Sequence, residues 1–478
     1  MAARITAQQA RRRATVLAVS AALGGFLFGF DSSVINGAVD AVQGEFELGD
    51  TLIGFSVAIA LLGSAFGAWL GGRLADRWGR IRVMVLGSVL FTVSSIGCAF
   101  VFSVWDLILW RVVGGVGIGI ASVIAPAYIA EIAPAAVRGR LGSLQQLAIT
   151  LGIFAALLSD AVFANTSGGA AEPSLFGLDA WRWMFLVGVV PAVVYGFVAL
   201  SIPESPRFLV VAGRREEAVD VLTQVSHPDE DVAGRVEEIE RTIAEDEANA
   251  RSATLRGPAL GLRPIVWVGI LLSVFQQLVG INVIFYYSTT LWQAVGFAES
   301  QSFTVSVLTA VTNVVVTFVA IALIDKVGRR RLLLTGSAGM AASLGVMALA
   351  FTQQIGEGDD VALAGSWGVV ALVAANVFVV SFGATWGPAV WVLLGEMFPN
   401  RIRAAALGVA AAAQWITNFA VTMTFPPLLG AFGASIPYLM YAIFAALSFV
   451  FVLWKVPETK GVELEDMKGH TAQRTPRD

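Results

Sequence analysis

The segment that decides the fold is residues 51–80, TLIGFSVAIALLGSAFGAWLGGRLADRWGR. Residues 51–75 form a predominantly apolar run, long enough to cross the roughly 30 Å hydrocarbon core of a bilayer as one helix. A charged turn, DRWGR, follows at 76–80, and the same order recurs where the apolar run 302–324 precedes DKVGRR at 325–330. A membrane helix that ends in a basic turn therefore occurs twice, which indicates an internal repeat.

Similar apolar runs continue on both sides of these two segments. Six precede residue 203 and six follow residue 263, and polar or charged residues separate each run from the next. The predicted spans are 14–37, 51–75, 83–102, 107–130, 141–163, 182–202, 264–292, 302–324, 332–354, 366–395, 404–430 and 436–455. The sequence therefore predicts an all-α membrane protein with twelve transmembrane helices.

Composition supports this class and excludes several others. Hydrophobic residues make up 56% of the 478-residue chain and charged residues 14%, against about a quarter charged in soluble domains. The sequence contains no basic stripe with interleaved aromatic residues, which is the pattern that would indicate nucleic-acid binding. The single cysteine, Cys98, excludes a disulfide framework, and His227 and His470 lie in hydrophilic segments. No metal, cofactor or catalytic residue is therefore expected, and proton chemistry inside the membrane has to use carboxylates.

A charged segment separates the two sets of spans. Residues 204–263 are rich in Arg, Glu and Asp but keep helical apolar spacing. We therefore expect a bundle at 1–203, a helical linker at 204–263, a second bundle at 264–457 and a tail at 458–478. The linker is either a solvated domain or, as we favour, a set of small helices docked on the cytoplasmic face.

Arginine and lysine placement predicts the orientation. Alternate connections carry the basic residues, namely Arg73, Arg77, Arg80, Arg82, Arg138, Arg140, Lys326, Arg329, Arg330, Arg331, Arg401 and Arg403. The connections between them are acidic or neutral. Both termini and the linker are therefore predicted to be cytoplasmic, in a multi-pass protein of the cytoplasmic (inner) membrane.

Two further echoes support duplication of a six-helix unit. Glu131 and Arg138 follow the fourth span as Glu396 and Arg403 follow the tenth. The first half ends on Pro-Glu-Ser at 203–205 and the second on Pro-Glu-Thr at 457–459. Three motifs therefore recur at matched positions of the two halves. A duplicated six-helix unit explains this, and such duplication is common in secondary transporters.

The motifs together resemble the sugar porter family of the major facilitator superfamily, over the whole chain. The specific stretches are Arg111, PESPR at 203–207, QQLVGIN at 276–282 with Tyr286 and Tyr287, GRR at 328–330, and PETKG at 457–461. Within that family the chain looks most similar to bacterial glucose permeases and xylose–proton symporters. The resemblance implies a major facilitator fold of two six-helix bundles with a cytoplasmic helical linker.

Polar and aromatic residues inside the spans are candidates for binding a sugar. Amide side chains both donate and accept hydrogen bonds, as hydroxyl-rich ligands require, although such amides also pair helices. The resemblance places these residues at a central sugar site: Phe28, Gln146, Gln276, Gln277, Asn282, Tyr286, Asn313, Trp386, Gln414 and Trp415. Facilitative carriers of the family have a glutamate where this chain has Gly383, which favours a symporter-like pocket.

Asp31 and Arg111 form a second candidate pair. At 1.5 Å per residue, Asp31 lies about 25 Å from the cytoplasmic start of the first helix, and Arg111 about 6–9 Å below the outer start of the fourth. The two depths coincide in a core of about 30 Å, so the charges are expected to pair. The pair is either structural or a proton switch, and resemblance favours the switch because proton-coupled members carry an aspartate here.

Charged residues at the inner face match a network between bundles in the family. They are Arg80, Glu131, Arg138, Glu204, Arg207, Arg329, Arg330, Glu396, Arg403 and Glu458. Ordinary positive-inside topology explains the arginines but not the glutamates. We therefore expect these residues to clasp the two halves when the carrier is open to the outside.

The predicted function is import of a monosaccharide, with glucose as the first choice, by alternating access as a sugar–proton symporter. The partners would be the sugar, the proton and the lipid bilayer, with the monomer as the working unit. A facilitative uniporter of the same fold is the alternative, and a non-transporting sugar sensor is a further one. No nucleophile–base pair, nucleotide loop or metal cluster suggests an enzyme.

Overall fold

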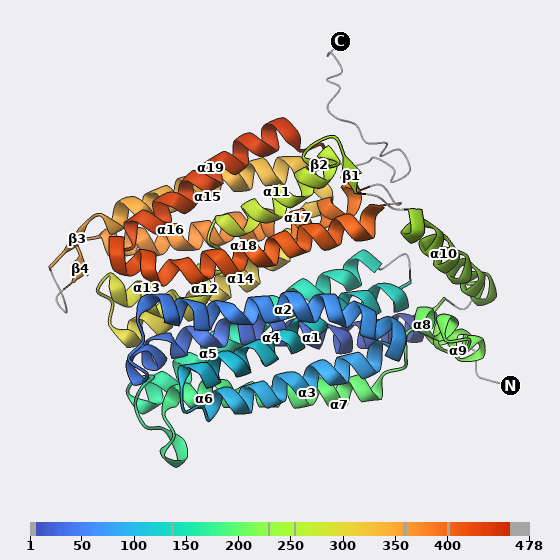
Figure 1. The fold of residues 1–478 in the computed structure, drawn as a ribbon, viewed down its shortest axis with the longest axis horizontal. Helices are drawn as coiled ribbons and strands as arrows, with labels where there is room; N and C mark the ends of the chain where they lie inside the picture. Colours follow the sequence, from blue (N-terminus) through green and yellow to red (C-terminus); the bar gives the residue numbers. More distant parts are fainter. Residues whose placement is uncertain are drawn as a thin grey trace, which may run out of the picture. The chain divides into compact units, whose positions relative to one another are not determined.

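The computed structural model describes residues 6–134, 138–227, 230–252, 255–356, 361–398 and 402–458. These residues are almost entirely helical (Figure 1). The chain folds into two compact units. Unit 1 comprises Met1–Phe46 and Ile59–Ala248, and unit 2 comprises Glu47–Ala58 and Asn249–Asp478. This division follows packing in space rather than chain order, so the domain boundaries expected from the sequence stay a prediction.

The helices of the first half and of the linker come first in the chain. They are α1 (Ala7–Glu45), α2 (Asp50–Trp78), α3 (Arg80–Ala99), α4 (Val104–Ile132), α5 (Arg138–Ser167), the 3-10 turn η2 (Leu175–Gly177), α6 (Ala180–Val187), α7 (Val189–Ser201), α8 (Pro206–Val211), α9 (Arg215–Val225) and α10 (Val232–Ser252). A short antiparallel pair, β1 (Arg256–Gly257) and β2 (Gly261–Leu262), then leads into the second half.

The second half repeats the pattern of long helices. Its elements are α11 (Pro264–Leu278), α12 (Val283–Tyr286), α13 (Ser288–Ala294), α14 (Glu299–Val327), α15 (Arg329–Phe351), β3 (Gln354–Ile355), β4 (Ala362–Leu363), α16 (Trp367–Ser381), the π-helical turn η4 (Phe382–Trp386), α17 (Gly387–Met397), α18 (Arg403–Phe432) and α19 (Ser435–Lys455). β3 and β4 pair antiparallel.

The prediction of twelve transmembrane helices is confirmed. Twelve helices of the described residues are long and apolar enough to cross a membrane. The largest difference is in α1, which begins at Ala7 rather than at the predicted residue 14. Thr6 caps it, because the Thr6 hydroxyl accepts from Gln9 N at 3.3 Å and the Gln9 side chain accepts from Thr6 N at 2.8 Å. The basic residues after the cap therefore belong to a helical extension.

Three spans that look continuous in the sequence are interrupted. The sixth is divided between α6 and α7 at Gly188, and the tenth contains the π-helical turn η4. The seventh stops at Leu278 and resumes at Val283, and Gly280 between them has a φ of +76°, which favours glycine. The breaks in the seventh and tenth spans fall beside several of the candidate sugar-site residues.

In unit 1, α1 and α5 pack at very short range. An added Cβ at Gly29 would lie 1.9 Å from Ile149 O, and one at Gly152 would lie 2.1 Å from Phe26 O. Only glycine fits such an approach of two helix backbones, which is the usual way in which membrane helices associate. The resulting contact fixes where α1 holds its polar side chains, including Asp31.

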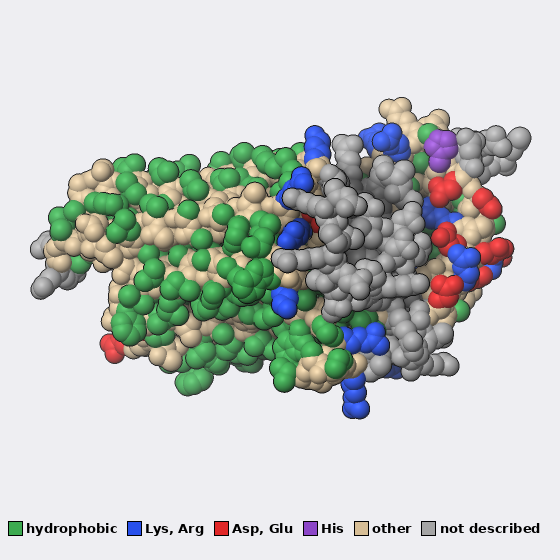
Figure 2. All heavy atoms as spheres, turned by 90° about the horizontal axis from the view of Figure 1, so that it is seen from above, with side chains coloured by type: hydrophobic (Ala, Val, Ile, Leu, Met, Phe, Trp, Pro, Cys, Tyr) green, Lys and Arg blue, Asp and Glu red, His purple; other side chains and the backbone are tan. Residues whose placement is uncertain are grey.

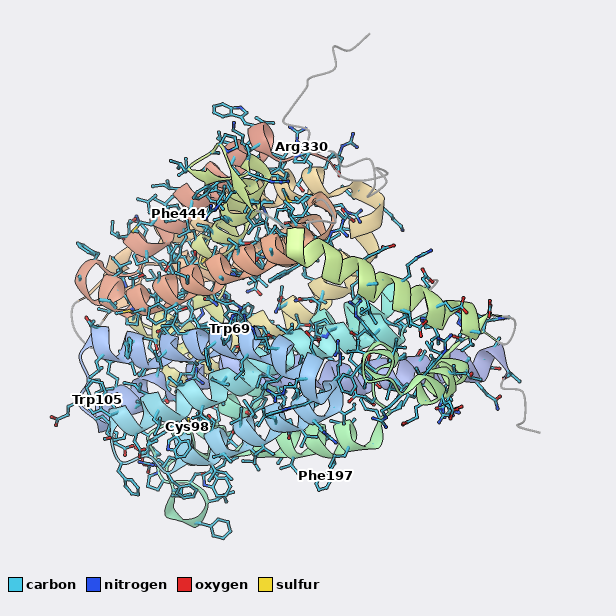
Figure 3. The ribbon with its side chains drawn as sticks, turned by 45° about the vertical axis from the view of Figure 1, so that its right-hand side comes forward. Trp69, Cys98, Trp105, Phe197, Arg330 and Phe444 are labelled. Atoms are coloured by element: carbon cyan, nitrogen blue, oxygen red, sulfur yellow. The ribbon has the colours of Figure 1, made fainter. Side chains whose placement is uncertain are left out.

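The linker is helical, as predicted. α9 packs against α1, and Ala10 and Ala14 near the start of α1 are 2% and 0% exposed. Figure 2 shows acidic and basic side chains gathered at the end that carries α8–α10, while hydrophobic side chains cover the long helices. Trp105 at the start of α4 and Phe197 on α7 point outward (Figure 3) and are 67% and 70% exposed. Such exposed apolar side chains fit contact with lipid.

Candidate functional site

Arg80 is the centre of a charge cluster in unit 1. It is the first residue of α3, and its Nε and Nη2 donate to the two carboxylate oxygens of Glu131 at 3.0 and 2.9 Å. Arg80 Nη1 also donates to Ala75 O at 2.9 Å. A planar guanidinium that meets a carboxylate through two parallel bonds is the strongest ion-pair geometry available. The pair ties the start of α3 to the last turn of α4.

Glu204 caps the same helix start. Its carboxylate accepts from the backbone N–H groups of Arg80 at 3.0 Å and Ile81 at 3.2 Å. These donors have no partner inside the helix, and the helix dipole adds positive potential at its N-terminus. Gly79 makes the approach possible, because it has a φ of +93° and a Cβ there would lie 2.3 Å from the Glu204 Oε2.

Unit 2 contains the same arrangement with different residues. Arg329 opens α15 and donates through Nε and Nη2 to Glu396 at 3.1 and 2.8 Å. Glu458 accepts from the backbone N–H groups of Arg329 at 3.0 Å and Arg330 at 3.2 Å, and Gly328 has a φ of +95°. The repeated motifs of the sequence thus form the same three-residue cluster once in each unit. Each cluster contains an arginine, a glutamate that pairs with its guanidinium and a glutamate that caps the start of its helix.

The ion pairs of these two clusters each lie within one unit. The expected clasp between the two halves concerns contacts between units and stays a prediction. Arg330 Nη2 donates to Leu453 O at 2.7 Å, and Arg403 Nε donates to Phe398 O at 3.1 Å. Arg207 is half-buried in α8, and Arg138 begins α5.

Sequence reasoning missed two polar residues that complete the unit 1 cluster. The Ser205 hydroxyl donates to Glu131 Oε2, and the Tyr128 hydroxyl donates to Pro203 O at 2.7 Å. Ser205 stands beside Glu204 in the repeated Pro-Glu-Ser motif, so the motif was a usable signal. Tyr128 gave none, because one tyrosine in an apolar helix is ordinary.

The predicted pairing of Asp31 with Arg111 is present in unit 1. Arg111 Nη1 lies 3.2 Å from Asp31 Oδ2, and the two side chains are 4% and 9% exposed for Arg111 and Asp31, respectively. α1 supplies the carboxylate and α4 supplies the guanidinium. Gly114, on α4, makes room for Ser94, because a Cβ there would lie 2.4 Å from Ser94 Oγ, whereas its distance to Asp31 Oδ1 would be an ordinary 3.8 Å. A buried ion pair of this kind is costly to break by removal of one charge only.

In unit 2 the predicted amides lie on both sides of the break in the seventh span. Gln276 Nε2 donates to Trp386 O at 3.1 Å and Gly387 O at 3.3 Å, so it joins α11 to the π-helical turn η4. Asn282 Nδ2 donates to Gln277 Oε1 at 2.6 Å, across the break. The break therefore places two amides side by side at its ends.

Two buried amide oxygens of this set have no partner among the described residues: Gln276 Oε1 and Gln414 Oε1. Asn313 is 9% exposed, and a Cβ at Gly383 would lie 3.5 Å from its Oδ1. That Cβ would also lie 3.0 Å from Val316 Cγ1, so glycine at 383 avoids a tight contact between η4 and α14. Unsatisfied acceptors in a membrane interior call for a polar partner, which a hydroxylated ligand can provide.

The predicted aromatic residues differ in how far they are enclosed. Trp386 is 0% exposed, and its indole N–H donates to Leu333 O at 2.9 Å and to Ser337 Oγ at 3.0 Å. Only its ring is left to contact a ligand. Tyr286 is 5% exposed, whereas Trp415, Phe28 and Gln146 are half-buried. Phe28 and Gln146 lie in unit 1 and the other eight candidates in unit 2, and one site shared by all ten stays a prediction.

The family profile described as sugar (and other) transporter matches residues 17–470. The chain belongs to this family. This sugar transporter is 55% identical over 448 residues to the glucose transport protein of Synechocystis sp., a match that covers 94% of this chain and 95% of the relative. Membership in this family makes it a transporter and not an enzyme.

Two further relatives extend the comparison. The D-xylose-proton symporter of Escherichia coli is 35% identical, and the match covers 94% of each chain. The partially occluded inward open structure of the xylose transporter XylE from E. coli has a TM-score of 0.81 at 32% identity, covering 95% of this chain and 100% of that one. The predicted fold class and the resemblance to sugar porters are both confirmed.

Proposed function

We propose that this sugar transporter imports a monosaccharide, with glucose as the first choice, together with a proton by alternating access. The observation that carries the proton coupling is the buried pair of Asp31 and Arg111, 3.2 Å apart. A carboxylate inside the membrane that has one cationic partner is a typical proton-binding arrangement. The name of the E. coli relative, a D-xylose-proton symporter, supports the same assignment.

Protonation of Asp31 gives the pair two states. With the carboxylate ionised, the charges of Asp31 and Arg111 balance. When a proton neutralises Asp31, Arg111 keeps its charge in a buried place, which costs several kcal/mol unless the surroundings rearrange. That differential cost is what lets proton binding shift a conformational equilibrium.

Sugar binding is assigned to the amides and aromatic residues of both units. Gln276, Gln277 and Asn282 offer donors and acceptors at the break after α11, and the Gln414 Oε1 atom offers another acceptor. Sugar hydroxyls pair with such groups, while aromatic rings contact the apolar CH face of the sugar. The glucose transport protein of Synechocystis sp. is the reason for placing glucose first.

The membrane location of the carrier and the role of its charge clusters as a gate are part of the proposed function. The carrier would lie in the inner membrane with both termini inside, as the basic connections predict, and would work as a monomer in the lipid bilayer. The charge clusters around Arg80 and Arg329 would favour the state open to the outside, and their opening would expose the sugar to the cytoplasm.

The test is uptake by the purified carrier in proteoliposomes. Labelled glucose, galactose and xylose are offered separately. Uptake of each sugar is measured with an inward proton gradient and again after a protonophore has collapsed the gradient. Accumulation of one sugar above its outside concentration, only while the gradient persists, is the expected result. Equilibration without accumulation of any sugar would replace the symporter with a uniporter, and lack of any sugar movement would reject sugar transport.

A further inference from the structure

Asp160 is a second buried carboxyl group in unit 1. It lies on α5 and is 0% exposed. Its Oδ2 accepts from the backbone N of Gly37 on α1 at 3.2 Å, and its Oδ1 has no hydrogen-bond partner among the described residues. The Gly37 N–H belongs to a continuous helix and serves that helix as well. The carboxyl group therefore has one shared donor for its four lone-pair positions.

Asp160 of α5 and Met184 of α6 both lie close against the backbone of α1 at Gly37. A Cβ at Gly37 would lie 2.8 Å from both Cβ and Cγ of Asp160 and 2.6 Å from the sulfur of Met184 on α6. The carboxyl group is thus enclosed between the backbone of α1 and an apolar side chain. Glycine at position 37 is what allows the two helices to enclose it.

Charged groups on the elements packed around Asp160 have other partners. On α1, Asp31 pairs with Arg111 of α4. On α6, Arg182 contacts Glu45 at 2.5 Å and Asp179 at 3.8 Å. Asp40, one helical turn beyond Gly37 on the same side of α1, is a further acid rather than a cation. Within the described part of the chain, Asp160 forms no ion pair.

A carboxyl group so placed is much more stable as the neutral acid than as the anion, since burial without a cation penalises the charged form. We propose that Asp160 is a second proton-binding site of this carrier, occupied in the state described here and emptied during the transport cycle. On release, the O–H bond of the acid breaks, the proton passes to water, and the carboxylate keeps the electron pair.

The repeat indicates that the fold does not require an acid at this position. α18 begins at Arg403 as α5 begins at Arg138, and the position in α18 that corresponds to Asp160 is Phe425. Phe425 is 0% exposed and packs against Tyr287 and Tyr438. An apolar side chain therefore fills the equivalent place, so the carboxyl group in unit 1 is better explained by function than by packing.

α1 connects the two carboxyl sites. Asp31 and the donor at Gly37 are on the same helix, about 9 Å apart along its axis at 1.5 Å per residue. A shift of α1 that follows protonation of Asp31 would also move the Gly37 N–H relative to Asp160. Asp160 is closer to the outer end of its helix than Asp31 is, so water can reach it after a smaller separation of α1 and α5. This coupling step depends on the proton symport proposed above.

The first test does not depend on transport. Infrared spectra of the purified carrier in lipid at neutral pH report the carbonyl stretch of protonated carboxylic acids, which shifts in heavy water once the proton exchanges. We expect this band in wild type and in the matched control Asp40→Asn, and its loss in Asp160→Asn. Asparagine keeps the shape of the neutral acid, so the variant should fold. An unchanged band in Asp160→Asn would overturn the proposal.

The second test measures coupling in proteoliposomes. Each coupled proton raises the limiting accumulation ratio about tenfold per pH unit of gradient, because a tenfold ratio corresponds to 1.4 kcal/mol. Asp160→Asn should therefore accumulate about tenfold less sugar than wild type at a gradient of one pH unit, while Asp40→Asn matches wild type. Equal accumulation in Asp160→Asn and wild type would overturn the second site. If wild type does not accumulate sugar at all, the proposed symport fails, and the infrared band alone decides whether Asp160 holds a proton.

Discussion

Replacement of Glu204 by glutamine should loosen the start of α3 in unit 1. The Glu204 carboxylate accepts three backbone N–H groups, from Arg80 at 3.0 Å, Ile81 at 3.2 Å and Ser205 at 2.8 Å. Glutamine keeps one acceptor oxygen but turns an NH₂ group toward the remaining donor. One unsatisfied donor costs about 1–3 kcal/mol, and loss of the charge at the helix N-terminus costs about 0.3–1 kcal/mol more. The expected loss of stability is therefore about 1.3–4 kcal/mol.

Cys98 provides the assay for this variant. It is the single cysteine of the chain, it is 2% exposed, and it lies on α3 itself. A thiol-reactive dye should therefore label it only when α3 opens, and labelling in detergent should begin at a lower temperature in Glu204→Gln than in wild type. At roughly 2–4 °C per kcal/mol for a domain of this size, the shift should be about 3–16 °C.

The duplicated cluster supplies the matched control. Glu458 makes the same two contacts to the start of α15, but it is exposed whereas Glu204 is half-buried. Water can replace the lost acceptor at Glu458, so Glu458→Gln should cost less, as followed by tryptophan fluorescence for both variants. If Glu204→Gln labels at the wild-type temperature, or if Glu458→Gln is the less stable of the two, the capping argument is wrong.

Three further substitutions test other parts of the account. Gln277→Ala and Asn282→Ala should each weaken sugar binding at least about tenfold. The hydrogen bonds to the ligand that one such substitution removes are together worth about 1.4 kcal/mol. Wild-type affinity in both variants would make these amides structural. Glu396→Gln should leave sugar binding measurable but slow net uptake, and unchanged uptake would remove the gating role of its cluster. Gly29→Val should abolish the folded carrier, because the added Cβ would lie 1.9 Å from Ile149 O; a normal yield of monodisperse protein would contradict the close packing of α1 on α5.

The length and spacing of apolar runs were enough to predict the twelve spans, because a membrane helix needs about 20 apolar residues whatever its neighbours are. The interruptions were not visible in that pattern. The run 264–292 stays apolar through the break after Leu278, and only Gly280 with its positive φ marks the place. Local backbone conformation there depends on the helices packed around it, which hydropathy does not report.

The candidate site shows the same division between residue identity and pairing. Repetition in the sequence identified Arg80, Glu131 and Glu204, but their pairing within unit 1 depends on where the start of α3 meets the end of α4. The pairing of Asp31 with Arg111 could be predicted, since both depths follow from helix geometry. Asp160 could not, because an acid near the end of the predicted span 141–163 resembles an ordinary helix edge.

Proton-driven accumulation by Asp31→Asn tests the central claim most directly. Asparagine mimics the protonated acid, and the amides that would bind sugar are unchanged. The variant should bind sugar and exchange it between vesicles loaded on both sides, yet an acidic exterior should no longer drive accumulation above the outside concentration. The same vesicles with wild type should accumulate sugar. If Asp31→Asn accumulates sugar as steeply as wild type under the same proton gradient, the pair of Asp31 and Arg111 is structural and the coupling mechanism proposed here is wrong.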